Sequence, residues 1–327
     1  MLSPSDFVFL PYTQDLTQAG IQYAVRSLAH TYNRMGGGPA NRLRRIVGGK
    51  AVELAFRRHL IERNVPFDNL GSTPFTDPDH YDISLGGRRC DLKSFLIYQR
   101  ERIHRLQRQP ETLMQTSALV PADQLAASHF SERDIYIFAF SAALVTRQAQ
   151  EVRKALQAGQ PAYFIHAMPP RWSQPVPWGS LGELSAKSAA SYTVEAELGG
   201  QLENHNFSSE YLALEPLTKS RLASDFFSLA YLHVAQLPDG QLGVHSPRLK
   251  QTYLVDLQDW DNIWVYGIQI ILAGWITRSE FRRRAQYLPA GRRVYQYART
   301  RTPNWALALS ELNPIKVLFD QVKDWAR

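Results

Sequence analysis

The segment Tyr81–Ile97, with the sequence YDISLGGRRCDLKSFLI, constrains the fold more than any other part of the chain. Two stretches of alternating character flank a Gly-Gly pair, which is typical of a β-hairpin with a two-residue turn. Such a turn fixes the register of the two strands. The expected facing pairs are Leu85 with Arg88, Ser84 with Arg89, Ile83 with Cys90, and Asp82 with Asp91.

One face of this hairpin is polar and the other is apolar or small. The polar face carries Asp82, Ser84, Arg89, Asp91 and Lys93. Carboxylates at facing positions, such as Asp82 and Asp91, lie with their Cβ atoms roughly 5 Å apart and repel each other. Lys93 on the same face can offset this repulsion, and so can a divalent metal ion with hard oxygen ligands. A solvated face with an incidental Asp-Asp-Lys cluster is the alternative interpretation.

A helix is expected in the segment that precedes the hairpin, beginning at Pro39 and ending near Asn64. One stripe of this helix is mainly apolar and faces a core: Ile46, Gly49, Glu53, Phe56 and Leu60. Glu53 therefore points toward a core, where an unpartnered charge is costly. Either it occupies an edge position beside Arg57, or it points at the same metal ion as Asp82 and Asp91.

The order of predicted elements indicates an α/β fold built on a mixed sheet. The run DIYIFAFSAAL, residues 134–144, predicts a central strand that is covered on both faces. Residues 159–257 predict an inserted or appended α+β module, with a helix from about Ser220 to Leu229. The chain then divides into three parts: helices and a core in 1–158, the module in 159–257, and a return strand, basic helix and tail in 258–327.

Composition suggests where the protein acts and what it binds. The formal net charge is +7, from 37 Lys and Arg against 30 Asp and Glu, which favours a polyanionic partner. A single cysteine, Cys90, rules out an intramolecular disulfide and a cysteine-based zinc site. No targeting segment and no membrane span is visible, so we expect a cytoplasmic protein.

Glu53 on a helix, Asp82 in a strand and Asp91-Leu92-Lys93 in the next strand resemble the PD-(D/E)XK nuclease superfamily. The resemblance covers about residues 40–144 and implies a restriction-endonuclease-like core. The pair Pro78-Asp79 makes Asp79 a competing candidate for the first acid. The hairpin register favours Asp82, because Asp79 falls outside the paired strand.

The resemblance also implies a magnesium-dependent phosphodiesterase, with manganese as a substitute metal. Asp82 and Asp91 would bind the metal, the carbonyl of Leu92 would be a further ligand, and Glu53 would bind directly or through water. Lys93 would orient the attacking water or stabilise charge on the phosphorane. Hydrolysis of a phosphodiester needs such a metal-activated water and neutralisation of the developing charge.

We therefore expect an endonuclease that cuts double-stranded DNA, in restriction or another defence role by family analogy. The module and the Arg-rich tail would bind DNA, and a homodimer would supply two active sites. The first alternative is a DNA-binding accessory protein of recombination or transposition that uses a nuclease-like fold without catalysis. The second is an unrelated α+β enzyme with a fortuitous hairpin.

Overall fold

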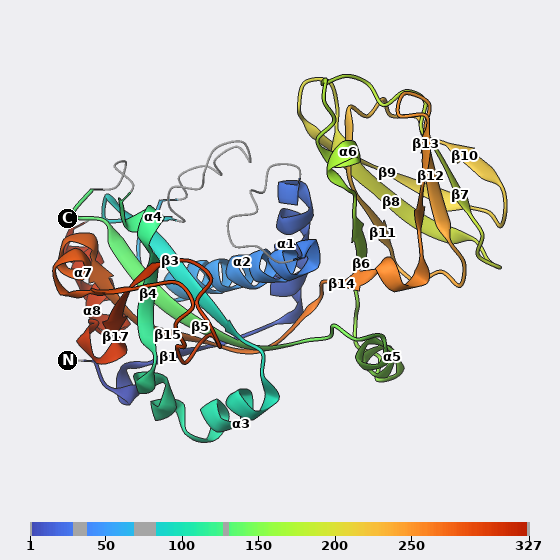
Figure 1. The fold of residues 1–327 in the computed structure, drawn as a ribbon. Helices are drawn as coiled ribbons and strands as arrows, with labels where there is room; N and C mark the ends of the chain where they lie inside the picture. The colour runs from blue at the N-terminus through green and yellow to red at the C-terminus, as the bar shows by residue number, and fades with distance from the viewer. Residues whose placement is uncertain (1, 29–37, 69–82, 127–130, 326–327) are drawn as a thin grey trace.

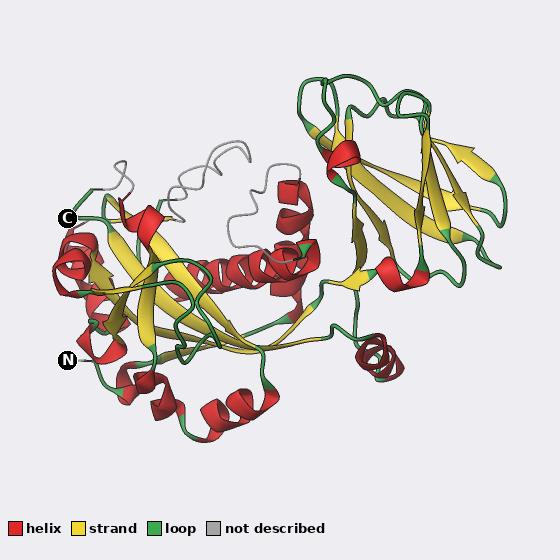
Figure 2. Ribbon diagram, in the orientation of Figure 1, coloured by secondary structure: helices red, strands yellow, loops and turns green. Residues whose placement is uncertain are grey.

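The structure is a computed structural model that describes residues 2–28, 38–68, 83–126 and 131–325. It has an α/β domain that contains both ends of the chain and a separate module of antiparallel strands (Figure 1, Figure 2). The mixed α/β class expected from the sequence is confirmed. No helix of the described residues is long and apolar enough to cross a membrane.

The α/β domain is built on one five-stranded mixed sheet. Its strands, in spatial order, are β1 (Val8–Pro11), β15 (Val265–Thr277), β5 (Ile135–Val145), β3 (Arg88–Ile97) and β2 (Ile83–Leu85). Strands β3 and β5 are parallel, and all other neighbours are antiparallel. A parallel pair needs a long crossover, and here it runs through α3 (Arg100–Arg108), β4 (Ser117–Pro121) and α4 (Ala122–Ala126).

The β2–β3 hairpin has the register expected from its turn. Ile83 pairs with Cys90, Ser84 with Arg89, and Leu85 with Arg88. Both turn glycines have positive φ, +54° at Gly86 and +73° at Gly87, as a two-residue turn of the I′ kind requires. The sequence prediction for this part of the hairpin is confirmed.

Alternate residues of β5 belong to two different hydrophobic cores, so both faces of the sheet are covered. Ile137 and its neighbours on one face pack against α1 (Gln14–Ser27), α2 (Pro39–Glu62) and α8 (Ile315–Trp325). Phe138 and its neighbours on the other face pack against α3, α7 (Arg278–Arg284) and a small sheet. That sheet has the order β16 (Gln286–Leu288), β17 (Asn304–Ala308) and β4. The expected central strand is therefore confirmed.

Short 3-10 helices complete this domain: η1 (Pro4–Asp6), η3 (Pro110–Gln115) and η5 (Leu309–Glu311). Helix α2 begins at Pro39, as the sequence predicts, and ends at Glu62, two residues before Asn64. Asn64 takes a positive φ of 52°, a conformation in which a helix commonly terminates.

The module is inserted between the adjacent strands β5 and β15, after helix α5 (Ala149–Gln157). One of its sheets has the order β14 (Asp261–Asn262), β6 (Phe164–Ala167), β11 (Ser228–Val234), β8 (Val194–Gln201) and β9 (Phe207–Leu214). The other has the order β10 (Lys219–Arg221), β7 (Ser185–Ser188), β12 (Leu242–Ser246) and β13 (Gln251–Val255). A third core fills the space between these sheets.

The helix expected from Ser220 to Leu229 is wrong, because this stretch contributes to strands β10 and β11. Leu222 and Phe226 are four residues apart and both buried, which imitates helical periodicity. The described helices of the module are the short α6 (Pro170–Ser173) and η4 (Leu257–Asp259), so its two sheets are the main architecture rather than an even α+β mixture.

Arg44 of α2 connects the module to the α/β domain. Its side chain is 4% exposed and donates two hydrogen bonds, of 2.6 and 2.8 Å, to the backbone carbonyl of Asn262 in β14. Asp261 lies 3.5 Å from the same guanidinium. Tyr231 of the module also belongs to the core beneath α2. The insertion is therefore packed against the helix that borders the candidate site.

Candidate active site

The candidate site lies along the open edge of β3. Strand β2 pairs with β3 only from Arg88 to Cys90, so the described part of the sheet leaves the edge from Asp91 to Ile97 without a neighbouring strand. A cavity of about 450 Å³ runs beside this edge, lined by five consecutive strand residues, Leu92 to Leu96. Helix α2 lines the cavity on one side and β4, α4 and the segment 297–304 on the other.

Asp91 and Lys93 project from the face of β3 that is turned away from α2. Cys90 and Leu92 pack into the core under α2, so the intervening and following residues lie on the other face. The Lys93 ammonium lies 2.5 Å from the Asp91 carboxylate, and the two side chains are only 13% and 16% exposed. The expected pairing of this lysine with an acidic neighbour is present.

Two residues that the sequence did not single out complete the surroundings of this pair. Lys93 Nζ donates to Gln124 Oε1 of α4 at 2.7 Å. The ring of Tyr136, which faces Asp91 in the parallel ladder, lies 5.9 Å from the same ammonium. Burial and then the charge of Asp91 raise the pKa of Tyr136. No sequence signal marks Gln124, because its position depends on how the crossover places α4.

Glu53 lies on α2, against the opposite face of the sheet from Asp91 and Lys93. It is 8% exposed and accepts two hydrogen bonds from Lys50, of 2.7 and 2.9 Å, besides pairing with Arg57. The expected inward position of Glu53 is confirmed, and the place beside Arg57 that one of the two interpretations requires is observed. Its role toward a metal ion stays a prediction.

Asp82 and Asp79 lie outside the described residues, so their predicted place beside Asp91 stays a prediction. Within the described ranges, no group of three or more His, Cys, Asp or Glu side chains could hold a metal ion. Magnesium is commonly held by one or two carboxylates and several waters. Asp91, with a second acid such as Asp82 beside it, would fit such a donor set.

The cavity beside β3 is strongly basic, and none of its described lining residues is acidic. Its cationic residues are Arg44, Arg45, Lys93, Arg147, Arg299 and Arg301. Burial lowers the pKa of Arg45, and the charges of Arg301 and Arg147 lower it further. These arginines line the same cavity, so their positive charges repel one another. An anion in this cavity would relieve their repulsion.

Arg299 and Arg301 come from the tail that the sequence marks as basic and aromatic, whereas Arg45 comes from α2 and Arg147 follows β5. Tyr297 lies with them, and its burial raises the pKa of its phenol to about 12. In the sequence, this basic cavity is indicated by the run NRLRR at the start of α2, since three arginines in four positions are unusual for a packed helix. The fold gathers these groups from three distant segments.

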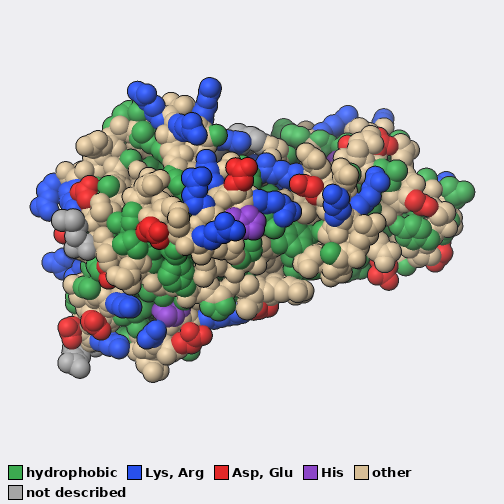
Figure 3. Space-filling model, turned by 90° about the horizontal axis from the view of Figure 1, so that it is seen from below, with side chains coloured by type: hydrophobic (Ala, Val, Ile, Leu, Met, Phe, Trp, Pro, Cys, Tyr) green, Lys and Arg blue, Asp and Glu red, His purple; other side chains and the backbone are tan. Residues whose placement is uncertain are grey.

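The basic surface continues beyond this cavity. Tyr98 and Arg147 also line a second cavity, of about 1020 Å³, together with Arg100 and Lys154. Figure 3 shows Lys and Arg side chains gathered in the middle of the lower face of the molecule, with a few acidic side chains among them. The two cavities therefore adjoin along a surface that is longer than one phosphate group.

Comparison of the chain with protein-family models, with curated proteins and with solved structures gave no match. The resemblance to the PD-(D/E)XK nucleases therefore rests on the residues and their arrangement alone.

Proposed function

We propose that this protein is a metal-dependent endonuclease that hydrolyses phosphodiester bonds in DNA. The observation that supports the proposal best is the place of Lys93. It is paired with Asp91 and lines a cavity in which all the other charged residues described are arginines. An acid and a lysine two residues apart on one strand, beside a basic cavity, suit a reaction at a phosphate.

The charges of the cavity match a polyanionic substrate. Arginine binds phosphate oxygens through two parallel hydrogen bonds, and lysine acts as a compact positive charge. Arg45 and Arg301 would hold the phosphates of the bound strand, and Lys93 would stabilise negative charge that develops at the reacting phosphate. The adjoining second cavity, which Arg147 shares, favours a polymer over a mononucleotide as substrate.

A magnesium ion would be held by Asp91, by Asp82 as the predicted second acid and by the carbonyl of Leu92, with Glu53 as a candidate ligand from across the strand edge. When bound, the ion supplies a water activated at neutral pH. Gln124 then has a role independent of the metal, because its hydrogen bond keeps the Lys93 ammonium at the cavity wall.

A DNA-binding protein without catalysis is the second candidate. One observation favours it: the described carboxylates of the site, Asp91 and Glu53, are both already paired with cations. Such pairs also serve a purely structural role. Only the first function predicts cleavage of DNA, so a cleavage assay distinguishes the two.

The test is incubation of the full chain with supercoiled plasmid and Mg²⁺ or Mn²⁺, followed by mapping of the cut ends. We expect cleavage by the wild type and a loss of about 100-fold or more in Lys93→Ala, with DNA binding retained. Lys187→Ala, which changes the exposed side chain of strand β7 in the module, is the matched control and should cleave normally. A wild type that binds DNA but cuts none would support the second candidate, and equal cleavage by Lys93→Ala would remove the assigned site.

A further inference from the structure

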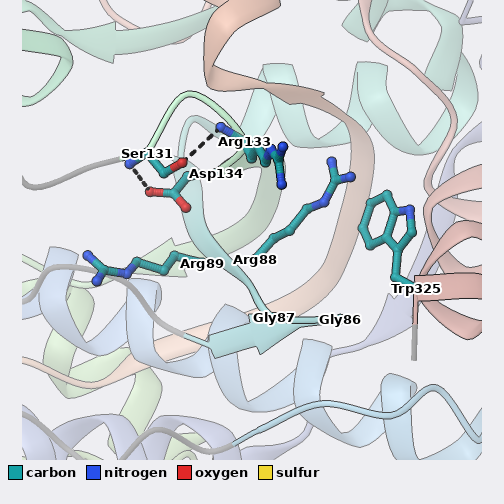
Figure 4. Close-up of a pocket in the computed structure, with 8 residues that line it drawn as sticks. All are labelled: Gly86, Gly87, Arg88, Arg89, Ser131, Arg133, Asp134 and Trp325. Atoms are coloured by element: carbon teal, nitrogen blue, oxygen red, sulfur yellow. Dashed lines mark hydrogen bonds between the residues drawn. The ribbon is translucent and has the colours of Figure 1, made fainter. Parts of the chain in front are cut away.

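A separate cavity lies at the turn of the β2–β3 hairpin (Figure 4). Its volume is about 440 Å³, and it shares no lining residue with the cavity beside the edge of β3. Three parts of the chain meet there: the Gly86-Gly87 turn with the start of β3, the residues that precede β5, and the end of α8. The pocket is therefore lined by segments that lie far apart in the sequence.

Arg88 is held in this pocket by an aromatic ring. Its guanidinium lies 3.7 Å from the ring centroid of Trp325, which is a cation–π contact. Trp325 in turn packs on the turn, because a Cβ atom added to Gly86 would lie only 2.8 Å from the Trp325 Cβ. The glycine therefore allows the indole to approach, and the indole orients the arginine.

Arg133 brings a second positive charge to the same place. Figure 4 shows the side chains of Arg88 and Arg133 pointing toward each other, while Arg89 points the opposite way. Burial lowers the pKa of Arg88, and the charge of Arg133 lowers it further. Among the described residues, no salt bridge joins Arg88 or Arg133 to a carboxylate. Two facing guanidinium groups are thus left to repel each other.

Among the described residues that line the pocket, Asp134 is the acidic one, and it already accepts a hydrogen bond. Its carboxylate accepts a hydrogen bond of 2.6 Å from the backbone N–H of Ser131, and its side chain is buried. This bond closes the turn that leads into β5, so Asp134 has a structural role. The pocket keeps an excess of positive charge.

We propose that this pocket binds a phosphate group between the guanidinium groups of Arg88 and Arg133. Two arginines that converge, and that form no salt bridge with a carboxylate of the described residues, offer several N–H donors in planes that match phosphate oxygens. A bound phosphate anion would replace their repulsion by attraction, and the Trp325 ring holds Arg88 ready for it. The ligand is therefore a phosphate monoester or diester.

This phosphate is not the one at which Asp91 and Lys93 would act. Arg88 lies three residues before Asp91, about 10 Å along an extended strand, and on the other face of β3. The pocket can be filled by a phosphate of the DNA backbone, which rests on the proposed function, or by a free phosphate compound, which does not. Both sources share the same chemistry.

The first experiment titrates the full chain with inorganic phosphate, against chloride at equal ionic strength, by calorimetry and tryptophan fluorescence. We expect saturable binding to the wild type, weakened about tenfold or more in Arg88→Gln and in Arg133→Gln. Arg63→Gln, an exposed arginine outside the pocket, is the matched control and should bind as the wild type does. Trp325→Phe should keep the calorimetric signal and lose the fluorescence change.

Absence of phosphate binding in the wild type, or equal binding by Arg88→Gln and Arg133→Gln, would overturn the proposal. Neither outcome depends on DNA cleavage, so failure of the proposed function would be recognised separately. Circular dichroism of each variant establishes that the hairpin and α8 are still folded.

The second experiment identifies the source of the phosphate by measuring DNA affinity over a range of salt concentrations. If the ligand is a backbone phosphate, the double variant Arg88→Gln/Arg133→Gln lowers the slope of log K against log salt by about two units. If the ligand is a free phosphate compound, the slope is unchanged while inorganic phosphate binding is lost.

Discussion

Lys93 and Asp91 form a salt bridge of 2.5 Å on one face of β3, next to the residues that pair with the described part of β2. The edge of β3 borders the arginine-lined cavity, so a phosphate held there would meet Lys93 directly. The predictions below follow from this arrangement and from the packing that supports it.

Gln124 is expected to position Lys93. Replacement by Leu removes the acceptor of the 2.7 Å hydrogen bond and leaves a chain of similar size. We expect single-turnover cleavage to fall about tenfold with DNA affinity unchanged, because the contact acts on the lysine rather than on the DNA. Gln157→Leu, at the exposed end of α5, should leave both quantities unchanged. A loss of affinity with an unchanged rate would contradict this role.

Arg45 is expected to bind DNA, and in the free protein neighbouring arginines repel its charge. Replacement by Met keeps an apolar stem and removes a charge that lies among Arg301, Arg147 and Arg42. We expect the slope of log K against log salt for DNA binding to fall by about one unit. The free energy of unfolding should not decrease, because repulsion is relieved. If urea unfolding shows a loss of stability together with unaltered DNA binding, Arg45 is structural instead.

Gly86 and Gly87 offer a matched pair of substitutions. Both have positive φ, so Ala in either place costs about 1 kcal/mol or more of folding free energy. Only Gly86→Ala also forces Trp325 away, whereas a Cβ at Gly87 meets nothing within 4 Å. Urea denaturation should therefore show a clearly larger loss for Gly86→Ala. Equal losses would mean that Trp325 does not pack on this turn in solution.

Arg44 is expected to hold the inserted module in place. Arg44→Ala leaves the carbonyl of Asn262 without its buried donor, which costs about 1–3 kcal/mol. Hydrogen exchange should rise at residues 261–262 and in β6, which pairs with them. Arg63→Ala, an exposed residue just past the end of α2, is the control and should change stability by no more than about 0.5 kcal/mol. Unchanged exchange in Arg44→Ala would contradict the role.

His233 is expected to make the folding stability of the module depend on pH, and the direction of its pKa shift fixes the sign. Its ring stacks on Tyr163 with a centroid distance of 3.5 Å, and its Nδ1 lies 2.8 Å from the carbonyl of Phe164, to which it donates. Burial lowers the pKa of His233, although the Phe164 carbonyl and Glu197 act in the other direction. Because the unfolded state then binds more protons near pH 6, stability should fall as the pH drops below about 6.5.

The measurement is urea unfolding of the wild type and of His233→Phe between pH 8 and pH 5. The variant keeps an aromatic ring for the stack but has no proton to bind, so its stability should change less over this range. A wild type whose stability rises on acidification through pH 6.5, with the variant flat, would reverse the sign assigned to His233.

The sequence determines the local elements of this fold well. The Gly-Gly turn allowed the described register of the hairpin to be predicted, because a two-residue turn leaves one pairing. The uninterrupted apolar run of residues 134–144 identified a strand buried on both faces. Pro39 and Asn64 marked the ends of α2 by their backbone preferences. Each of these signals acts over a few residues.

The arrangement of the site was harder to predict, because it depends on long-range packing. The apolar stripe of α2 shows which side of the helix faces the sheet, but not which face of the sheet receives it. Glu53 therefore approaches from the face opposite to Asp91 and Lys93. The basic cavity combines Arg45, Arg147 and Arg301 from three segments, and no local pattern shows that they meet.

The measurement that tests the central claim most directly is single-turnover cleavage of a duplex by Asp91→Asn over a range of Mg²⁺ concentrations. Asn keeps the size of the side chain and removes its charge, so the fold and metal-free DNA affinity should be retained. We predict a cleavage rate reduced by about 100-fold or more at every Mg²⁺ concentration. A variant that cleaves at the wild-type rate would show that Asp91 and the edge of β3 are not the active site.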